Sequence, residues 1–167
     1  NIWIAQREGR AKDSDDRTEE SVLKMMAMGG NGSVIDRLKA LNIVPLAISY
    51  EYDPCDYLKA KEFQQKRDNP DFKKSKQDDL TNMQTGIFGY KGRVRYCLAS
   101  PVNTWIHELA NLPKGEFFTE LARGIDRAIH TSYTIFPINY VAVDLLQGTQ
   151  NYTHCYTPDE KQRFEQY

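Results

Sequence analysis

One run of apolar residues, 43–50, limits the folds open to this chain more than any other feature. It is almost unbroken over the length of a strand, and such continuity is typical of a strand buried on both faces of a parallel sheet. Pro45 cannot donate to a strand ladder, so it marks a strand start, an edge or a bulge. A shorter apolar run, residues 2–5, suits a second buried strand. Helical patterns separate the two runs, and the order strand, helix, strand predicts a right-handed crossover unit.

The patterns in the rest of the chain mainly predict helices. Asp16 or Thr18 can cap a first helix, and Ser33 with Asp36 three residues later predicts a second. Residues 92–98 alternate between apolar and polar side chains and predict a half-buried strand, whose outward arginines are expected to lie at the surface. Further helices are expected over residues 57–67, 80–88, 105–109, 117–128 and 138–146, and after Thr157. We therefore expect an α/β fold with a small, mostly parallel sheet, helical crossovers and a C-terminal helical portion.

Composition excludes several functional classes. A chain of 167 residues can form one domain with a sizeable core, and its net charge of −1 gives no general reason to bind nucleic acid. No apolar run approaches the length that spans a bilayer. Cys55, Cys97 and Cys155 are distant from one another and odd in number, which predicts reduced thiols in a cytosolic setting. No spacing of His, Cys, Asp and Glu predicts a metal site.

A dense group of charges follows the first apolar run. Arg7, Arg10 and Lys12 can donate to an anion, and the planar guanidinium fork suits a phosphate. Gly9 allows the backbone to approach a bound group closely. Glu8 can hold one of the cations in place or accept a hydrogen bond from a substrate hydroxyl. The alternative interpretation is a solvated turn before a helix.

Two segments resemble blocks of the PlsC-like glycerolipid acyltransferases, the family of the lysophosphatidate acyltransferases. Residues 7–10, Arg-Glu-Gly-Arg, are similar to the family's third block, Glu-Gly-Thr-Arg, which contacts the phosphate of the acceptor. Residues 44–48, Val-Pro-Leu-Ala-Ile, resemble the fourth block, a hydrophobic strand that contains a proline. The blocks occur in the family's order within the first third of the chain. The family's arginine two places after the glycine is Ala11 here, between Arg10 and Lys12.

The resemblance implies a fold, a reaction and a site. The fold would be glycerol-phosphate-acyltransferase-like, with residues 1–102 as the C-terminal part of an acyltransferase α/β domain and residues 103–167 as a helical portion packed on it. The reaction would transfer a fatty acyl group from a thioester to the hydroxyl of a glycerophosphate-type lipid. The resemblance assigns the acceptor phosphate to Arg7, Glu8, Gly9, Arg10 and Lys12.

The catalytic pair of this family, His-x4-Asp, precedes these two blocks. The histidines of this chain are His107, His130 and His154, and only the last has an aspartate, Asp159, at that spacing. It follows the blocks instead, so we interpret the spacing as coincidence. We expect the catalytic pair upstream of Asn1, in a longer protein of which this chain is the C-terminal part, and we expect no activity from the chain alone.

The resemblance also implies partners. The acyl donor would be acyl-CoA or acyl carrier protein, with no bound cofactor or metal, and the acceptor a glycerophospholipid precursor. A membrane surface is a further candidate partner and nucleic acid is not, which places the protein in the cytoplasm, peripheral on the inner face of the membrane.

Other interpretations stay open. Residues 59–76 carry seven lysines and arginines with Phe63 and Phe72 between them, and could touch anionic headgroups or an acidic carrier protein. Acidic residues nearly cancel this charge, which favours a solvated helix pair. For the chain as a whole, the rivals are a non-catalytic anion- or carrier-protein-binding domain and a phosphate-handling enzyme of another class.

Overall fold

The structure is a computed structural model that describes residues 2–7, 15, 17–113 and 115–167. The chain divides into two compact units. Unit 1 comprises Asn1–Ile48 and Tyr96–Tyr133, and unit 2 comprises Ser49–Arg95 and Thr134–Tyr167. The predicted division into residues 1–102 and 103–167 describes family segments rather than compact units, and it stays a prediction.

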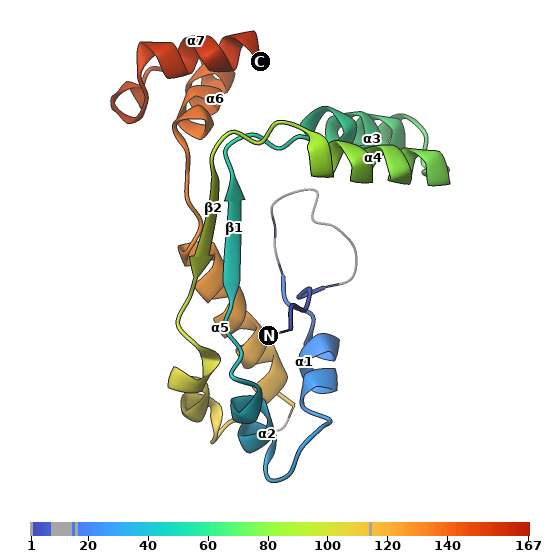
Figure 1. Cartoon of the computed structure of the whole chain (residues 1–167), viewed down its shortest axis with the longest axis vertical. Coiled ribbons are helices and arrows are strands. Elements are labelled where there is room, and N and C mark those ends of the chain that lie inside the picture. Colours follow the sequence, from blue (N-terminus) through green and yellow to red (C-terminus); the bar gives the residue numbers. More distant parts are fainter. Residues whose placement is uncertain (1, 8–14, 16, 114) are drawn as a thin grey trace. The chain divides into compact units, whose positions relative to one another are not determined.

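The predicted α/β fold, with a mostly parallel, glycerol-phosphate-acyltransferase-like sheet and helical crossovers, is wrong, because the structure is mainly helical. The described residues form a single sheet of two strands, β1 (Leu46–Tyr50) and β2 (Val94–Leu98), which run antiparallel (Figure 1). Backbone hydrogen bonds fix this direction, from Ala99 N to Pro45 O at 2.9 Å and from Glu51 N to Arg93 O at 2.8 Å. The helical segment between the strands returns the chain in the opposite direction, so no right-handed crossover forms.

The predicted strand over residues 43–50 exists, and it begins directly after Pro45 as the missing N–H of proline requires. The expectation that both of its faces are buried is wrong. Ala47 is buried, whereas the alternate residues Ile48 and Tyr50 are exposed. β1 therefore has one buried and one open face, as strands of antiparallel sheets often do.

The predicted first strand, residues 2–5, is not formed. Its apolar side chains are among the most exposed of the chain, with Ile2 at 87%, Trp3 at 75% and Ile4 at 56%. An apolar run becomes a strand only where a neighbour supplies backbone partners, and within the described sheet β1 and β2 pair with each other.

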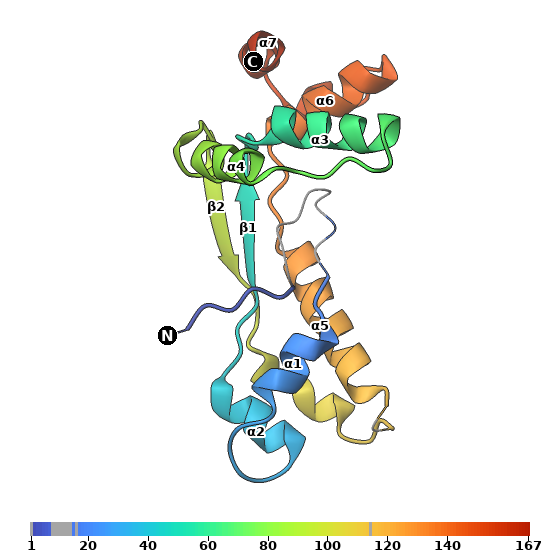
Figure 2. The ribbon, with the colours of Figure 1, turned by 90° about the vertical axis from the view of Figure 1, so that its right-hand side faces the viewer.

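Unit 1 is a helical unit around an apolar core. Its elements are α1 (Glu20–Met26), α2 (Val34–Leu41), two 3-10 helices (Val102–Thr104 and Ile106–Leu109) and α5 (Phe117–Thr131). The long helix α5 lies beside α1, as Figures 1 and 2 both show. Helix α5 presents a stripe of buried residues at helical spacing to this core, namely Phe117, Leu121, Ala122, Ile125 and Ile129.

Local signals predicted the start of α2 but not the form of the segment around residues 102–109. The predicted cap of α2 is confirmed, because Ser33 and Asp36 form a reciprocal capping box. The helix expected over residues 105–109 is instead the pair of 3-10 helices. The side chain of Asn103 does not cap a helix there but donates to the backbone carbonyl of Lys39 at 2.9 Å.

Unit 2 contains α3 (Asp56–Asp68), α4 (Lys76–Phe88), α6 (Pro137–Gln147), a 3-10 helix (Thr153–Cys155) and α7 (Pro158–Gln166). The predicted start of α7 is confirmed, since Thr157 and Glu160 form a capping box with proline at the first helical position. Its buried apolar cluster is small and consists of Tyr52, Phe136 and Ile138, with Phe164 packed against it.

A bilayer core is spanned by about 20 apolar helical residues. The longest helix that the structure describes, α5, has 15 residues, and it is amphipathic. Within the described ranges, no helix combines the length and the apolar composition that crossing a membrane would require.

Candidate functional site

The predicted anion site falls largely outside the described residues. Glu8, Gly9, Arg10 and Lys12 lie outside them, so their assignment to the phosphate stays a prediction. Arg7 is described and is half-buried. Its Nε atom is buried and has no hydrogen-bond partner among the atoms that the structure describes. A buried guanidinium N–H of this kind is an unused donor at the edge of the predicted site.

Three described residues that flank the charged segment, Gln6, Thr18 and Glu19, are hydrogen-bonded within unit 1. On the near side, the carbonyl of Gln6 accepts a hydrogen bond from Glu19 N at 2.9 Å. On the far side, the backbone N and the hydroxyl of Thr18 donate to one carboxylate oxygen of Asp126 on α5, at 2.7 and 2.6 Å. Residues 6 and 19 are therefore adjacent, and Thr18 is tied to α5.

This arrangement changes the role predicted for Thr18. The N-cap residue of α1 is Glu19, and it makes no side-chain capping bond. The hydroxyl of Thr18 is turned to Asp126 instead, and Thr18 is buried. Its capping role is therefore wrong, because a tertiary hydrogen bond over 108 residues replaces the local one. Asp16, the other predicted cap, lies outside the described residues.

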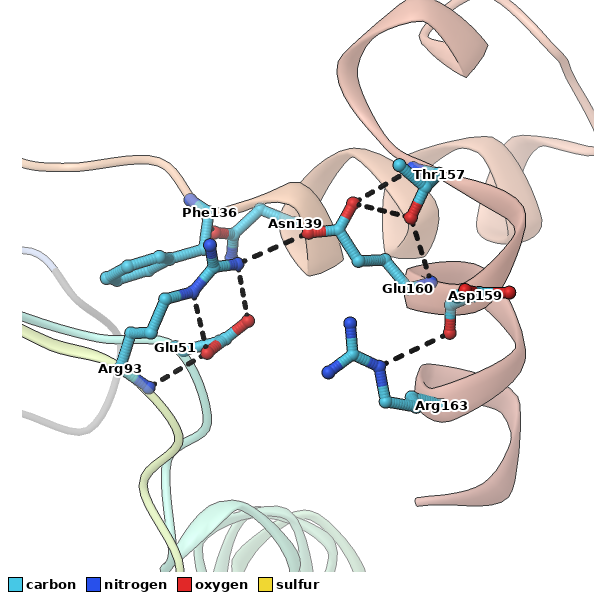
Figure 3. Close-up of polar contacts among 8 residues, drawn as sticks. All are labelled: Glu51, Arg93, Phe136, Asn139, Thr157, Asp159, Glu160 and Arg163. Atoms are coloured by element: carbon cyan, nitrogen blue, oxygen red, sulfur yellow. Dashed lines mark hydrogen bonds and ion pairs between the residues drawn. The ribbon is translucent and has the colours of Figure 1, made fainter.

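A second polar site lies in unit 2, where two carboxylates meet an arginine (Figure 3). Arg93 donates through Nε and Nη2 to the two oxygens of Glu51, at 3.0 and 2.7 Å, and its backbone N donates to Glu51 at 2.8 Å. Glu160 approaches Arg93 Nη2 at 3.5 Å. The guanidinium carbon also lies 5.5 Å from the ring centroid of Phe136. Such bidentate, charge-assisted pairs have a defined geometry as well as strength.

The ion pair keeps both partners charged. Hydrogen bonding to Arg93 lowers the pKa of Glu51 below its usual range, although partial burial opposes this, and the charge of Arg163 assists. The same pair raises the pKa of Arg93. The backbone N–H of Thr157 is the main cause that lowers the pKa of Glu160. Glu160 thereby connects the first turn of α7 to the Glu51–Arg93 pair.

A surface pocket of about 300 Å³ lies beside this cluster and is lined by Glu51, Tyr52, Tyr90, Arg163, Gln166 and Tyr167. The ring of Tyr52 packs against those of Tyr90 and Tyr167, with centroids 5.4 and 4.6 Å apart. Burial is the main cause that raises the pKa of Tyr52, so this hydroxyl stays protonated at neutral pH. Because Arg93 occupies both oxygens of Glu51, this carboxylate is poorly placed to act as a general base.

Asp144 forms a third polar centre within unit 2, and its role is structural. Its carboxylate accepts hydrogen bonds from the hydroxyls of Thr149 and Tyr156 and from the backbone N atoms of Asn151 and Tyr152. Burial alone would raise the pKa of Asp144, but these hydrogen bonds together lower it. The carboxylate therefore ties the C-terminal end of α6 to the turn that leads into α7.

Sequence reasoning did not find the Glu51–Arg93 pair. It interpreted Arg93 as a surface charge on an edge strand, and the arginine is indeed largely exposed, but it is engaged by a half-buried glutamate 42 residues away. The available signal was positional: Glu51 directly follows the predicted strand 43–50, and Arg93 is the second residue of the predicted strand 92–98. Antiparallel pairing of these strands would have brought the two together.

Metal-ligating groups and cysteine thiols provide no further candidate site among the described residues. The part of the chain that the structure describes contains no group of three or more His, Cys, Asp and Glu residues arranged to hold a metal ion. Cys55, Cys97 and Cys155 are half-buried free thiols.

Comparison with known proteins assigns no relationship. No family model, no curated protein and no solved structure matches the chain.

Proposed function

We propose that this chain supplies the acceptor-phosphate site for the transfer of a fatty acyl group from a thioester to the hydroxyl of a glycerophosphate-type lipid. The order of the two sequence blocks supports the proposal, with Arg-Glu-Gly-Arg at residues 7–10 and the proline-containing strand block at residues 44–48. The anchoring of Gln6, Glu19 and Thr18 supports it as well, because a binding segment needs a fixed base.

The observation that carries the proposal is the Nε atom of Arg7. It is buried without a hydrogen-bond partner in the described part of the chain. A buried donor left unsatisfied destabilises the fold by about 1–3 kcal/mol, more when it is charged. An anionic oxygen would satisfy this donor, and phosphate oxygens suit a guanidinium particularly well.

The resemblance supplies the chemistry of the reaction. Arg7, Arg10 and Lys12 would hold the phosphate, Glu8 would orient a cation or a hydroxyl, and Gly9 would permit close approach. A histidine upstream of Asn1 would take the proton of the acceptor hydroxyl, and an aspartate would orient that histidine. The hydroxyl oxygen would then form a bond to the thioester carbonyl, and the thiol of coenzyme A or of acyl carrier protein would leave. Such an enzyme would act in the cytoplasm, at the inner membrane surface.

Binding of glycerol 3-phosphate and of a soluble, short-chain lysophosphatidate tests the site directly. We expect Arg7→Ala and Arg10→Ala each to weaken binding on the order of 10- to 100-fold, because a hydrogen bond to a charged group contributes about 1.5–3 kcal/mol. In a full-length enzyme, Arg10→Ala should raise the acceptor KM while the chain stays folded. Arg67→Ala is the matched control, since Arg67 pairs with its neighbour Asp68 at the surface of α3. Binding unchanged by Arg7→Ala and Arg10→Ala would contradict the site.

The alternative is a non-catalytic domain that binds an anion or a carrier protein. The pairing of Glu51 with Arg93 favours it, because this carboxylate lining the pocket of unit 2 is held in an ion pair rather than poised as a base. Acyl-transfer assays on the full-length protein separate the two. Acceptor binding with turnover supports the transferase, and acceptor binding without turnover supports the binding domain.

A further inference from the structure

Helix α4 carries its large apolar side chains on the outside. Leu80, Met83, Ile87 and Phe88 are exposed to 59%, 52%, 64% and 80%. Residues 80, 83 and 87 are three and four apart, so they form one stripe along the helix. An exposed apolar stripe on a surface helix indicates an interaction site.

The opposite face of α4 is the one that packs within unit 2, and it is polar and small. Asn82 is buried, and its side chain donates to the carbonyl of Asp78 at 2.8 Å. The thiol of Cys55 donates to the backbone carbonyl of Asn82 at 3.4 Å. A Cβ added at Gly86 would lie 3.5 Å from the same sulfur. This is the reverse of the usual amphipathic helix, whose apolar face packs inward.

Two lysines bracket the apolar stripe. Lys76 lies four residues before Leu80, on the same side of the helix. At the other end, the Nζ atom of Lys91 donates to the carbonyls of Ile87 and Gly89, both at 3.0 Å. Positive charge therefore stands at each end of the stripe.

The acidic residues of α4 do not offset these lysines along the stripe. The carboxylate of Asp78 accepts hydrogen bonds from the backbone N and the hydroxyl of Ser75, at 3.0 and 2.6 Å. Asp79 pairs with Lys74 at 3.3 Å. At 100° per residue, Asp78 falls on the side of the helix away from Leu80 and Asp79 falls on its flank. The outward face is thus apolar in the middle and cationic at both ends.

We propose that α4 is a membrane-surface helix that lies on an anionic lipid bilayer. Its stripe enters the boundary between headgroups and acyl chains. Lys76 extends to the lipid phosphates, and the Lys91 ammonium contributes positive charge at the other end of the stripe. The cationic ends favour this occupant over an apolar protein surface, because anionic headgroups complement them at both ends of the stripe. The inference does not depend on the acceptor site, which lies in unit 1.

Cosedimentation with lipid vesicles tests the proposal. We expect the protein to bind vesicles of phosphatidylcholine with phosphatidylglycerol, and to bind pure phosphatidylcholine far more weakly. Leu80→Gln with Ile87→Gln should lower binding by about tenfold or more, because two leucine-sized side chains no longer enter the lipid. The matched control is Leu145→Gln with Leu146→Gln on α6, two exposed leucines outside the stripe, which should leave binding within about twofold.

A charge variant and a tryptophan fluorescence variant complete the test. Lys76→Gln should lower binding by about fivefold, since each lysine near an anionic surface contributes about 1 kcal/mol. Met83→Trp should show a blue-shifted emission when anionic vesicles are added, whereas Leu146→Trp should not. This measurement does not depend on how well the glutamine variants fold.

Four outcomes would overturn the proposal. One is that anionic vesicles do not bind the wild-type chain. Another is that the glutamine pairs on α4 and α6 lower binding equally. A third is that Met83→Trp shows no blue shift. The fourth is a concentration-dependent dimer in the absence of lipid that Leu80→Gln with Ile87→Gln abolishes, which would make a second copy of the chain the occupant of the stripe.

Discussion

Unit 1 buries one connected cluster of apolar side chains drawn from α1, α2, α5 and the 3-10 helices, whereas the buried apolar cluster of unit 2 is limited to Tyr52, Phe136 and Ile138. Unit 2 instead concentrates polar contacts, with a bidentate ion pair between Glu51 and Arg93 and a carboxylate hub at Asp144. Unit 1 is stabilised mainly by the burial of apolar surface, an effect that does not depend on the direction of individual contacts. The stability of unit 2 depends more on the geometry of its polar contacts and on the charge state of a few groups.

The difference follows from the helices themselves. In α5, every third or fourth residue is apolar and buried, so one helix organises most of the core. In α3 and α4 the buried residues are Glu62 and Asn82, and both are polar. Glu62 is paired with Lys66 at 2.9 Å and with Lys74 at 3.1 Å. Buried charges of this kind define one arrangement but contribute less stability than apolar packing.

The largest effect should come from the core of unit 1. Leu121 is fully buried, and we expect Leu121→Ala to lower the free energy of unfolding by about 2–5 kcal/mol, through lost burial and the cavity that remains. Urea denaturation followed by circular dichroism measures this change. Leu146→Ala, at a residue exposed to 88%, is the control and should change stability by less than about 0.5 kcal/mol. A comparable loss at both positions would contradict the core described for unit 1.

The ion pair of unit 2 should matter next. Glu51→Gln leaves Arg93 without its bidentate partner, and we expect a loss of about 1–2 kcal/mol, discounted because the arginine is largely exposed. A double-mutant cycle with Arg93→Gln measures the coupling of the two side chains. A coupling energy near zero would mean that unit 2 is not held by this pair.

Acid should weaken unit 2 more than unit 1, where the two described carboxylates with lowered pKa values, Glu20 and Asp36, are bonded chiefly to Lys24 and Ser33 within or beside their own helices. Hydrogen bonds lower the folded-state pKa values of Glu51, Asp144 and Glu160, whereas in the unfolded chain aspartate and glutamate titrate near about 3.9 and 4.3. A depressed folded pKa contributes stability above the unfolded value, and this contribution is lost as pH falls through the folded value. At pH 4 these carboxylates are only partly protonated. We therefore expect unit 2 to lose less stability there than it loses through Glu51→Gln.

Hydrogen exchange between pH 7 and about pH 3.5 resolves the two units. Amides of α6 and α7 should lose protection as the pH falls, while those of α5 keep theirs. Equal loss in α5 would show that the polar contacts of unit 2 do not set its acid sensitivity. In the Glu51→Gln variant, the acid response of unit 2 should be smaller, because one of the titrating groups has been removed.

Features set by neighbours in sequence were predictable, and features set by distant residues were not. The helix starts at the capping boxes of α2 and α7 depend on local chemistry, and both were predicted correctly. Pro45 was predicted to mark a strand start, an edge or a bulge, and the structure shows the first of these. Strand direction is not local. The alternation in β2 defined its two faces, but its apolar face, with Val94, Tyr96 and Leu98, is exposed, and within β2 only Cys97 on the other face is half-buried. Sequence patterning states which residues share a face and leaves open which face another element covers.

The candidate sites divide in the same way. The charged segment was found because its chemistry is contiguous in sequence, from Arg7 to Lys12. The Thr18–Asp126 bond that anchors this segment spans 108 residues, and the Glu51–Arg93 pair spans 42. No periodicity connects residues so far apart, so both arrangements become visible only in the folded chain.

The smallest expected effect comes from removing a helix cap, and this change can be made in both units. Ser33→Ala removes the cap of α2 in unit 1, and Thr157→Ala removes the cap of α7 in unit 2. Each change should lower the stability of its helix by about 1 kcal/mol, because one backbone N–H of the first turn loses its acceptor.

The consequences of the two cap removals should differ. Helix α2 is fixed to the core by the buried Leu38, so its loss should appear in global unfolding. Helix α7 touches the cluster of unit 2 through the partly buried Phe164, so its loss should appear as faster local hydrogen exchange in α7 with little change in the global midpoint. Equal global shifts in the two variants would mean that α7 unfolds only with the whole of unit 2, and the contrast between the two units would then be smaller than their cores suggest.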